Sequence, residues 1–280
     1  MKINNLFVSA SLTSKHGYSL GKRYDDIIEL RKLADYSNRV DAEPIWYDEK
    51  FWHTDLGNGQ TLSDQLYSPC TDCFEKQARD MMLRLINERM AEAGADLNAS
   101  ECIDVCLGTW PRAAGTLAEY LISRRALLSR SLDVGAYEKL LPSCFPNLIF
   151  AEKFLHRYKS KEFSSYRGEI IECLSVLNDD TMERLQDGRY SKQKIIHAIE
   201  AATHRPVGMD PNHRSDLMFS FALYDSSNMR PTGEMIEVCC EPHLKLLQDN
   251  SDLRIYFNLD SRRIGCKDKI LIGRIGGHPY

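Results

Sequence analysis

The sequence lacks several features that would place it in a familiar class. It has no apolar run of about 18 residues, so we expect no membrane-spanning helix. The opening segment MKINNLFVSASLTSKHG contains no long apolar stretch, so we also expect no secretory signal. Neither charge sign dominates, because 40 Asp and Glu face 36 Lys and Arg for a net charge of −4. This balance excludes a uniformly basic coat for nucleic acid and leaves room only for a local basic patch.

Established catalytic motifs are also missing. The sequence contains no G-x-S-x-G, no H-E-x-x-H and no Asp…Glu-x-Lys nuclease core. The glycines of IGRIGG near the C-terminus complete neither a G-x-G-x-x-G nor a P-loop. The eight histidines show no metal-ligand spacing. Any function must therefore come from residues that the fold brings together.

The length and the composition indicate a folded chain. With 280 residues, of which 43% are hydrophobic, it can form one large domain or two modest ones with a sizeable core. Its nine cysteines form an odd set, which suits a reducing cytoplasm better than a disulfide framework. We therefore expect a cytoplasmic protein.

The hydrophobic pattern changes along the chain. Helical spacing dominates the first two-thirds, most clearly in CFEKQARDMMLRLINERMAEAG, where the apolar stripe includes Phe74. Short strands are predicted at 3–12, 42–52 and 101–108. After about residue 205, short β-branched and aromatic runs alternate with polar turns, which is typical of an antiparallel meander. The predicted fold class is α+β, with a mainly helical domain at 1–205 and a small antiparallel β module at 206–280.

The last three predicted strands carry the most suggestive polar residues. Side chains two apart share one face of a strand, so Arg254 and Tyr256 oppose the apolar side of LRIYF. His243 and Lys245 are related in the same way in EPHLKL. We expect an outward basic face that contacts DNA or RNA, made of His243, Lys245, Arg254, Tyr256, Arg274 and His278. The face of Arg274 is ambiguous, because its spacing places it with Ile270 and Ile272.

Two alternatives to nucleic-acid binding stay open for these strands. The polar face can be a solvated surface that protects a sheet edge from aggregation. It can also cleave RNA without a metal, with Lys or His as acid or base, Arg on the developing phosphate charge and Tyr on the 2′-hydroxyl. The sequence does not choose between these readings.

Two cysteine pairs have spacings found in zinc sites. Cys70 and Cys73 form C-x2-C, and Cys102 and Cys106 form C-x3-C, so together they can supply four thiolates. The second pair lies in an apolar run, however, where cysteine commonly serves as a small buried side chain. Zinc is thus a candidate cofactor, and no other cofactor is predicted.

The two ends of the chain resemble a known group of sequences. The opening NNLFVSASL with the turn GNGQTLSDQL, and the closing HLKL…LRIYF…KILIGRIGGH, are similar to a family of uncharacterised bacterial proteins. Members of that family lie near mobile elements and phage-defence genes. The closing strands LRIYF and KILIGRIG also resemble, more weakly, those of RelE-type toxins, ribonucleases whose sheets carry Lys, Arg and Tyr or His on one face.

These resemblances imply two functions. The first is a non-catalytic component of a bacterial phage-defence or mobile-element system, which binds a protein encoded by a neighbouring gene, with nucleic acid at the C-terminal sheet and no membrane. The second is a metal-independent, toxin-like ribonuclease that uses the same face.

Overall fold

The computed structural model describes nine stretches of the chain, namely residues 5–8, 20–41, 44–53, 59–93, 102–105, 116–128, 134–156, 160–246 and 252–279. It divides into two compact units, Met1–Leu127 and Leu128–Tyr280, which we call the N-terminal and the C-terminal unit. The division lies between Leu127 and Leu128 instead of at residues 205–206. The reason is that the helices between residues 134 and 203 pack on the C-terminal sheet and belong to the same unit.

The N-terminal unit is built on a parallel four-stranded sheet. The strands follow the spatial order β3-β2-β1-β4, and they are β1 Asn5–Val8, β2 Ile45–Tyr47, β3 Met90–Glu92 and β4 Cys102–Val105. The expected short strands at 3–12, 42–52 and 101–108 correspond to β1, β2 and β4. Parallel neighbours cannot be joined by tight turns, so helices provide the connections.

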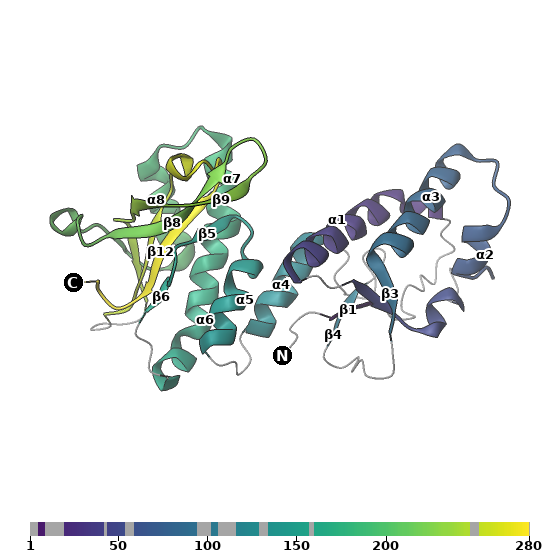
Figure 1. Cartoon of the computed structure of the whole chain (residues 1–280), viewed down its shortest axis with the longest axis horizontal. Coiled ribbons are helices and arrows are strands. Elements are labelled where there is room, and N and C mark those ends of the chain that lie inside the picture. Colours follow the sequence, from purple (N-terminus) through teal and green to yellow (C-terminus); the bar gives the residue numbers. More distant parts are fainter. Residues whose placement is uncertain are drawn as a thin grey trace. The chain divides into compact units, whose positions relative to one another are not determined.

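Two long helices connect these strands and lie side by side. They are α1 (Tyr24–Asp41), between β1 and β2, and α3 (Cys73–Arg89), between β2 and β3 (Figure 1). Asp72 caps α3, because its side chain accepts a hydrogen bond from the backbone N–H of Glu75. Shorter elements complete the unit: η2 Leu20–Arg23, η3 Glu49–His53, α2 Leu62–Tyr67 and α4 Leu117–Leu128.

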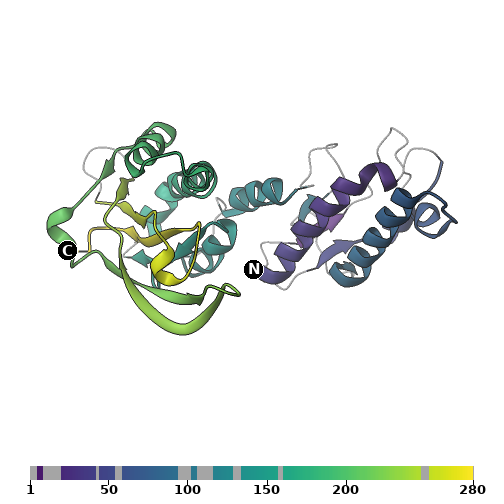
Figure 2. The same ribbon diagram turned by 90° about the horizontal axis from the view of Figure 1, so that it is seen from above.

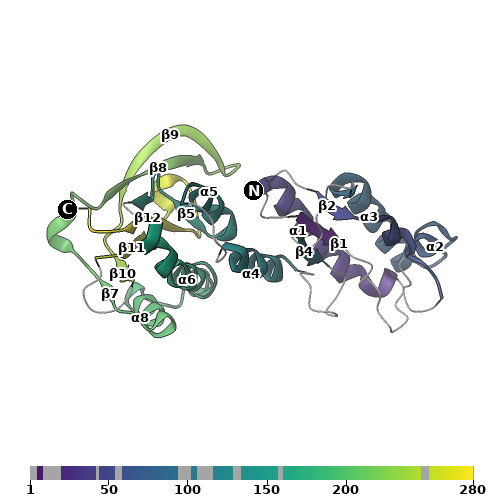
Figure 3. The ribbon, with the colours of Figure 1, turned by 90° about the horizontal axis from the view of Figure 1, so that it is seen from below.

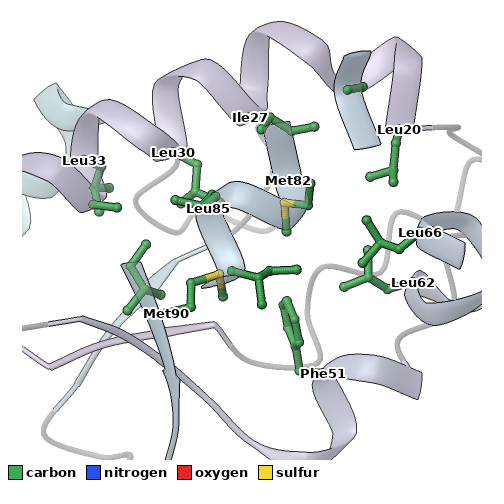
Figure 4. Packing of buried hydrophobic residues seen from close by; sticks show 14 of the residues in the cluster. Leu20, Ile27, Leu30, Leu33, Phe51, Leu62, Leu66, Met82, Leu85 and Met90 are labelled. Carbon is green, nitrogen blue, oxygen red and sulfur yellow. The ribbon is translucent and has the colours of Figure 1, made fainter. Parts of the chain in front are cut away.

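The core of the N-terminal unit lies beneath α1 and α3. Figure 4 shows Ile27, Leu30 and Leu33 from α1 meeting Met82 and Leu85 from α3, and all five are fully buried. The predicted apolar stripe of α3 holds from Ala78 to Ile86 but not at either end, because the helix stops at Arg89 and Met90 begins β3. Phe74 is 70% exposed, because it lies in the first turn, beyond the reach of the core.

The C-terminal unit contains a mixed sheet of six strands. The path is β5-β12-β11-β10-β7, and β6 pairs with β12 in addition. Its strands are β5 Leu148–Phe150, β6 Leu155–His156, β7 Val207–Gly208, β10 His243–Lys245, β11 Arg254–Asn258 and β12 Ile270–Gly276. Neighbours from β7 to β12 are antiparallel, whereas β5 and β6 run parallel to β12. The predicted C-terminal meander and the α+β class are confirmed.

This sheet is covered on both faces. Helices lie on one side and a long hairpin, β8 Met218–Asp225 with β9 Arg230–Cys239, lies on the other (Figures 2 and 3). The helical segments are α5 Val134–Cys144, α6 Ser160–Val176, a π-helical segment Leu177–Thr181, α7 Met182–Asp187 and α8 Lys192–Thr203. Two short 3-10 turns, Pro211–His213 and Arg262–Ile264, flank the hairpin and β12. A sheet enclosed in this way keeps few side chains in water.

Within the nine described stretches, no helix combines the length and the apolarity that crossing a bilayer demands.

Candidate functional site

The register of the last three strands brings the predicted polar residues together. His243 on β10 lies opposite Tyr256 on β11, which lies opposite Arg274 on β12. In the next row Lys245 lies opposite Arg254. Residues directly opposite each other in an antiparallel pair project from the same face. Five residues predicted from the sequence therefore form two adjacent rows, which together with His278 we call the polar cluster.

A β-bulge decides the face of Arg274. The β11–β12 register shifts between Tyr256 and Phe257, so Tyr256 pairs with Arg274 whereas Phe257 pairs with Ile272. Gly273 is the extra residue of β12 at this shift, and an added Cβ there would overlap the ring of Phe219 on β8. Because a bulge resets the alternation, Arg274 leaves the face of Ile272 and joins Tyr256.

The expectation of an open basic face was wrong. Tyr256 is fully buried, His243 is 3% exposed, and Arg254 and Arg274 are 8% and 9% exposed. Only Lys245 is well exposed, and His278 is half-buried. The reason is tertiary: the hairpin places Phe219 with its ring centroid 6.2 Å from that of Tyr256. The cluster is thus largely buried, with Lys245 exposed at its edge.

His243 is held by close contacts on two sides. Its ring lies 5.0 Å from that of Tyr256, between centroids. On the other side it packs against Gly208 of β7, where an added Cβ would overlap the imidazole. Its Nδ1 lies 3.6 Å from a carboxylate oxygen of Asp210 and 3.4 Å from the carbonyl oxygen of Glu241. The imidazole of His243 therefore has a defined position in the polar cluster.

Two further histidines complete the cluster, and one of them was missed. The hydroxyl of Tyr256 lies 2.9 Å from Nδ1 of His278. His156 was not foreseen, yet its Nδ1 lies 2.8 Å from Nη2 of Arg274. A guanidinium has no acceptor, so His156 accepts this hydrogen bond on an unprotonated nitrogen. His156 lies next to the cluster because β6 pairs with the end of β12. No local pattern in the sequence indicates that pairing.

Both histidines of the predicted set have a lowered pKa. For His243 the main cause is burial; Asp210 acts in the opposite direction, and the charge of Arg254 lowers the pKa further. Burial is also the main cause for His278, followed by Arg254, while Asp210 and Asp252 oppose the shift. Since the ordinary histidine pKa is about 6.5, both rings are mainly neutral at pH 7 and can accept a proton.

We expect the stability of the C-terminal unit to fall as the pH drops below 6.5, the ordinary histidine value. Below that pH the imidazole of His243 is protonated in the unfolded chain but still neutral in the folded chain. The unfolded state therefore binds more protons, which lowers the free energy of unfolding. Above that pH the contribution is fully present. Urea unfolding at several pH values, in wild type and His243→Gln, measures this effect.

The control for this pH experiment is His197→Gln, because the side chain of His197 is 67% exposed. The His243→Gln variant should lose part of the acid sensitivity and the His197→Gln variant should keep it. Equal pH dependence in all three proteins would show that the buried imidazole does not titrate as expected.

The four predicted zinc ligands are only partly described. Cys73 is exposed at the start of α3, and the thiol of Cys70 lies 3.6 Å from the carbonyl oxygen of Asp72. For Cys102 only the backbone is described, and Cys106 lies outside the described residues. No group of three or more metal-binding side chains occurs among the residues that the structure places. The zinc site stays a prediction.

Comparisons with protein-family models, with curated proteins and with solved structures found no match to this chain. The chemistry of the polar cluster is therefore inferred from its own contacts and charges. Lys245, Arg254 and Arg274 supply positive charge, and the neutral imidazoles supply proton acceptors. Such a set can hold a phosphate by charge-assisted hydrogen bonds.

Proposed function

We propose that the C-terminal unit binds a phosphate group of single-stranded nucleic acid at the polar cluster. The observation that carries this proposal is the strand register, which aligns Lys245 with Arg254 and, in the next row, His243 with Tyr256 and Arg274. Basic side chains held side by side on a rigid sheet need little reorganisation to receive an anion. The buried guanidiniums are the strongest element, because planar forks match phosphate oxygens.

Because the cluster is largely buried, we expect it to bind one phosphate group and not a series of phosphates along a nucleic-acid backbone. Arg254 and Arg274 lie below the surface and cannot line an extended duplex, whereas Lys245 at the edge can meet an incoming strand. A flexible single strand can bring one phosphate close to Lys245 and the partly covered guanidiniums, whereas a rigid duplex presents a long, evenly spaced backbone. We therefore expect single-stranded oligonucleotides to bind more tightly than duplexes of the same sequence.

Reversal of one charge tests the binding proposal. We expect Lys245→Glu to weaken binding of a single-stranded oligonucleotide about tenfold, through the lost contact and the new repulsion. The slope of log affinity against log salt should also become shallower by roughly 0.7 for each phosphate contact removed. Fluorescence anisotropy titrations at about 50 mM and about 200 mM salt measure both quantities.

The matched control is Lys267→Glu. Lys267 is exposed in the same unit but precedes the opposite end of β12, and its replacement changes the net charge equally. It should leave the affinity near that of wild type once the general charge effect is included. If both variants bind equally well, the phosphate is not held at the polar cluster.

Metal-independent cleavage of RNA is the second candidate. One observation favours it: the rings of His243 and His278 flank Tyr256, with centroid distances of 5.0 Å and 6.4 Å. One neutral imidazole could take the proton of a 2′-hydroxyl, and an arginine could neutralise the charge that develops on the phosphate. Running the bound RNA on a gel in the presence of a chelator distinguishes the two candidates. Intact RNA favours binding alone, and cleavage that His243→Gln abolishes favours the enzyme.

The biological setting follows from the resemblance of the two chain ends. We propose a role as a binding component of a phage-defence or mobile-element system, together with a protein from a neighbouring gene. The genes that surround this one, and co-purification with their products, bear directly on that role.

A further inference from the structure

A separate cavity of about 570 Å³ lies next to the polar cluster, within the C-terminal unit. Its volume falls within the usual range for small-molecule sites, which is about 300–1,000 Å³. The lining includes the apolar side chains of Met209, Met218 and Leu259, together with Arg214, Glu241 and Lys192. A mainly apolar cavity with a few charged groups is the usual form of a site for a partly polar small molecule.

The most specific group in this cavity is the carboxylate of Glu241. The residue is 7% exposed, and its Oε2 accepts a hydrogen bond from Nε of Arg214 at 2.8 Å and lies 2.7 Å from Nη2 in the same ion pair. Its other oxygen has no hydrogen-bond partner among the residues that the structure describes. An ionised carboxylate only accepts, so a ligand must present N–H groups to it.

The remaining polar groups of the cavity restrict further which chemical groups its ligand can carry. The amide of Asn258 is already used, because Nδ2 donates to the carbonyl of Cys239 and Oδ1 accepts from the N–H of Asp260. Recognition of hydrogen-bond donors therefore falls to Glu241. Lys192 attracts negative charge, whereas Arg214 is already paired with Glu241. The suitable ligand has an apolar body, N–H donors on one edge and an anionic group.

The cavity and the polar cluster share two chain segments. Met209 lines the cavity while its neighbour Asp210 faces His243. Glu241 and Pro242 line the cavity, while the carbonyl of Glu241 lies 3.4 Å from Nδ1 of His243. A phosphate in the cluster and a base in the cavity would thus lie on neighbouring parts of one ligand.

We propose that this cavity receives a guanine base; the inference rests on the proposed function, in which the adjacent cluster holds a phosphate. Guanine presents two neighbouring donors, N1–H and N2–H, to the open oxygen of Glu241. Adenine and cytosine offer this oxygen one N–H beside a ring acceptor, and uracil offers one N–H between two carbonyl oxygens, so each should bind more weakly than guanine. The methionine side chains are polarisable and pack well against a ring.

The test measures the binding of guanosine and of the monophosphates of guanosine, adenosine, cytidine and uridine by calorimetry. We expect the guanine nucleotide to bind at least about tenfold more tightly than the others. Glu241→Gln should remove about tenfold of that preference, because the carboxamide presents its own N–H groups. Glu237→Gln makes the same change at an exposed position on β9 and should have no effect.

A second variant guards against misfolding of the first. Met209 is 53% exposed and lines the cavity, so Met209→Trp is tolerated structurally and places a bulky side chain at the cavity mouth. It should weaken the binding of guanosine at least about tenfold, because the larger side chain occupies the space of the base. Equal affinity for all bases, or guanine preference that survives both variants, overturns the inference.

The design separates this inference from the proposed function. If guanosine fails to bind while Lys245→Glu still weakens binding of oligonucleotides, the guanine cavity is wrong and the phosphate site stands. If guanosine binds and Lys245→Glu has no effect on oligonucleotides, the cavity stands and the phosphate site is wrong.

Discussion

Replacement of Phe51 by alanine is expected to lower the free energy of unfolding of the N-terminal unit by about 3–5 kcal/mol. Phe51 is fully buried, and its ring lies 4.8 Å from that of Tyr47 and 5.3 Å from that of Trp52, between centroids. Figure 4 shows it beneath Leu62 and Leu66. Truncation removes buried apolar surface and leaves a cavity that the fixed helices cannot fill.

The control makes the same chemical change at an exposed site. Phe74 is 70% exposed, so Phe74→Ala should change the stability by less than about 0.5 kcal/mol. Tryptophan fluorescence during urea unfolding reports on the correct unit, because Trp46, Trp52 and Trp110 all lie in Met1–Leu127. A similar loss in both variants would mean that Phe51 does not anchor this core.

The second large effect is expected in the C-terminal unit, where Gly265→Ala should cost about 2–5 kcal/mol. Gly265 has φ +79°, a conformation that disfavours any residue with a Cβ. An added Cβ would in addition overlap the backbone carbonyl oxygen of Tyr224 on β8. A backbone atom cannot rotate away, so the hairpin itself must shift.

Gly188→Ala separates the two parts of this cost. Gly188 ends α7 with φ +65°, and an added Cβ there meets no atom within 4 Å. It should therefore lose only about 1 kcal/mol, from backbone conformation alone. Circular dichroism follows the unfolding of both units, and tryptophan fluorescence follows the N-terminal unit alone. The difference between the two signals gives the unfolding of the C-terminal unit. Equal losses for the two glycines would show that the contact with Tyr224 carries no energy.

The hydrophobic pattern predicted a strand or a helix well where one face of that element is apolar and the other is polar. Alternation in LRIYF predicted β11, and helical spacing predicted α3 apart from Phe74. The short strands β5 and β6 were not predicted. Three-residue and two-residue strands offer too few alternations, and β5 and β6 are strands only because they pair with β12.

The candidate site was predicted in part. Spacing within single strands correctly grouped His243 with Lys245 and Arg254 with Tyr256, and the register then aligned them. Spacing left the face of Arg274 ambiguous, and the bulge at Gly273 decided it by resetting the alternation. His156 and Asp210 come from distant segments, and no periodicity relates them to the cluster.

The amino-acid sequence by itself determined the α+β class, the C-terminal meander and the pairing of polar residues along each strand, because these depend on side-chain periods of 2 and 3.6. Only the tertiary structure decided that the polar face is largely buried and that the helices between residues 134 and 203 belong to the same unit as the sheet. The physical reason is that burial depends on which elements pack on a strand. In this chain the hairpin β8–β9 covers a face whose own residues give no sign of it.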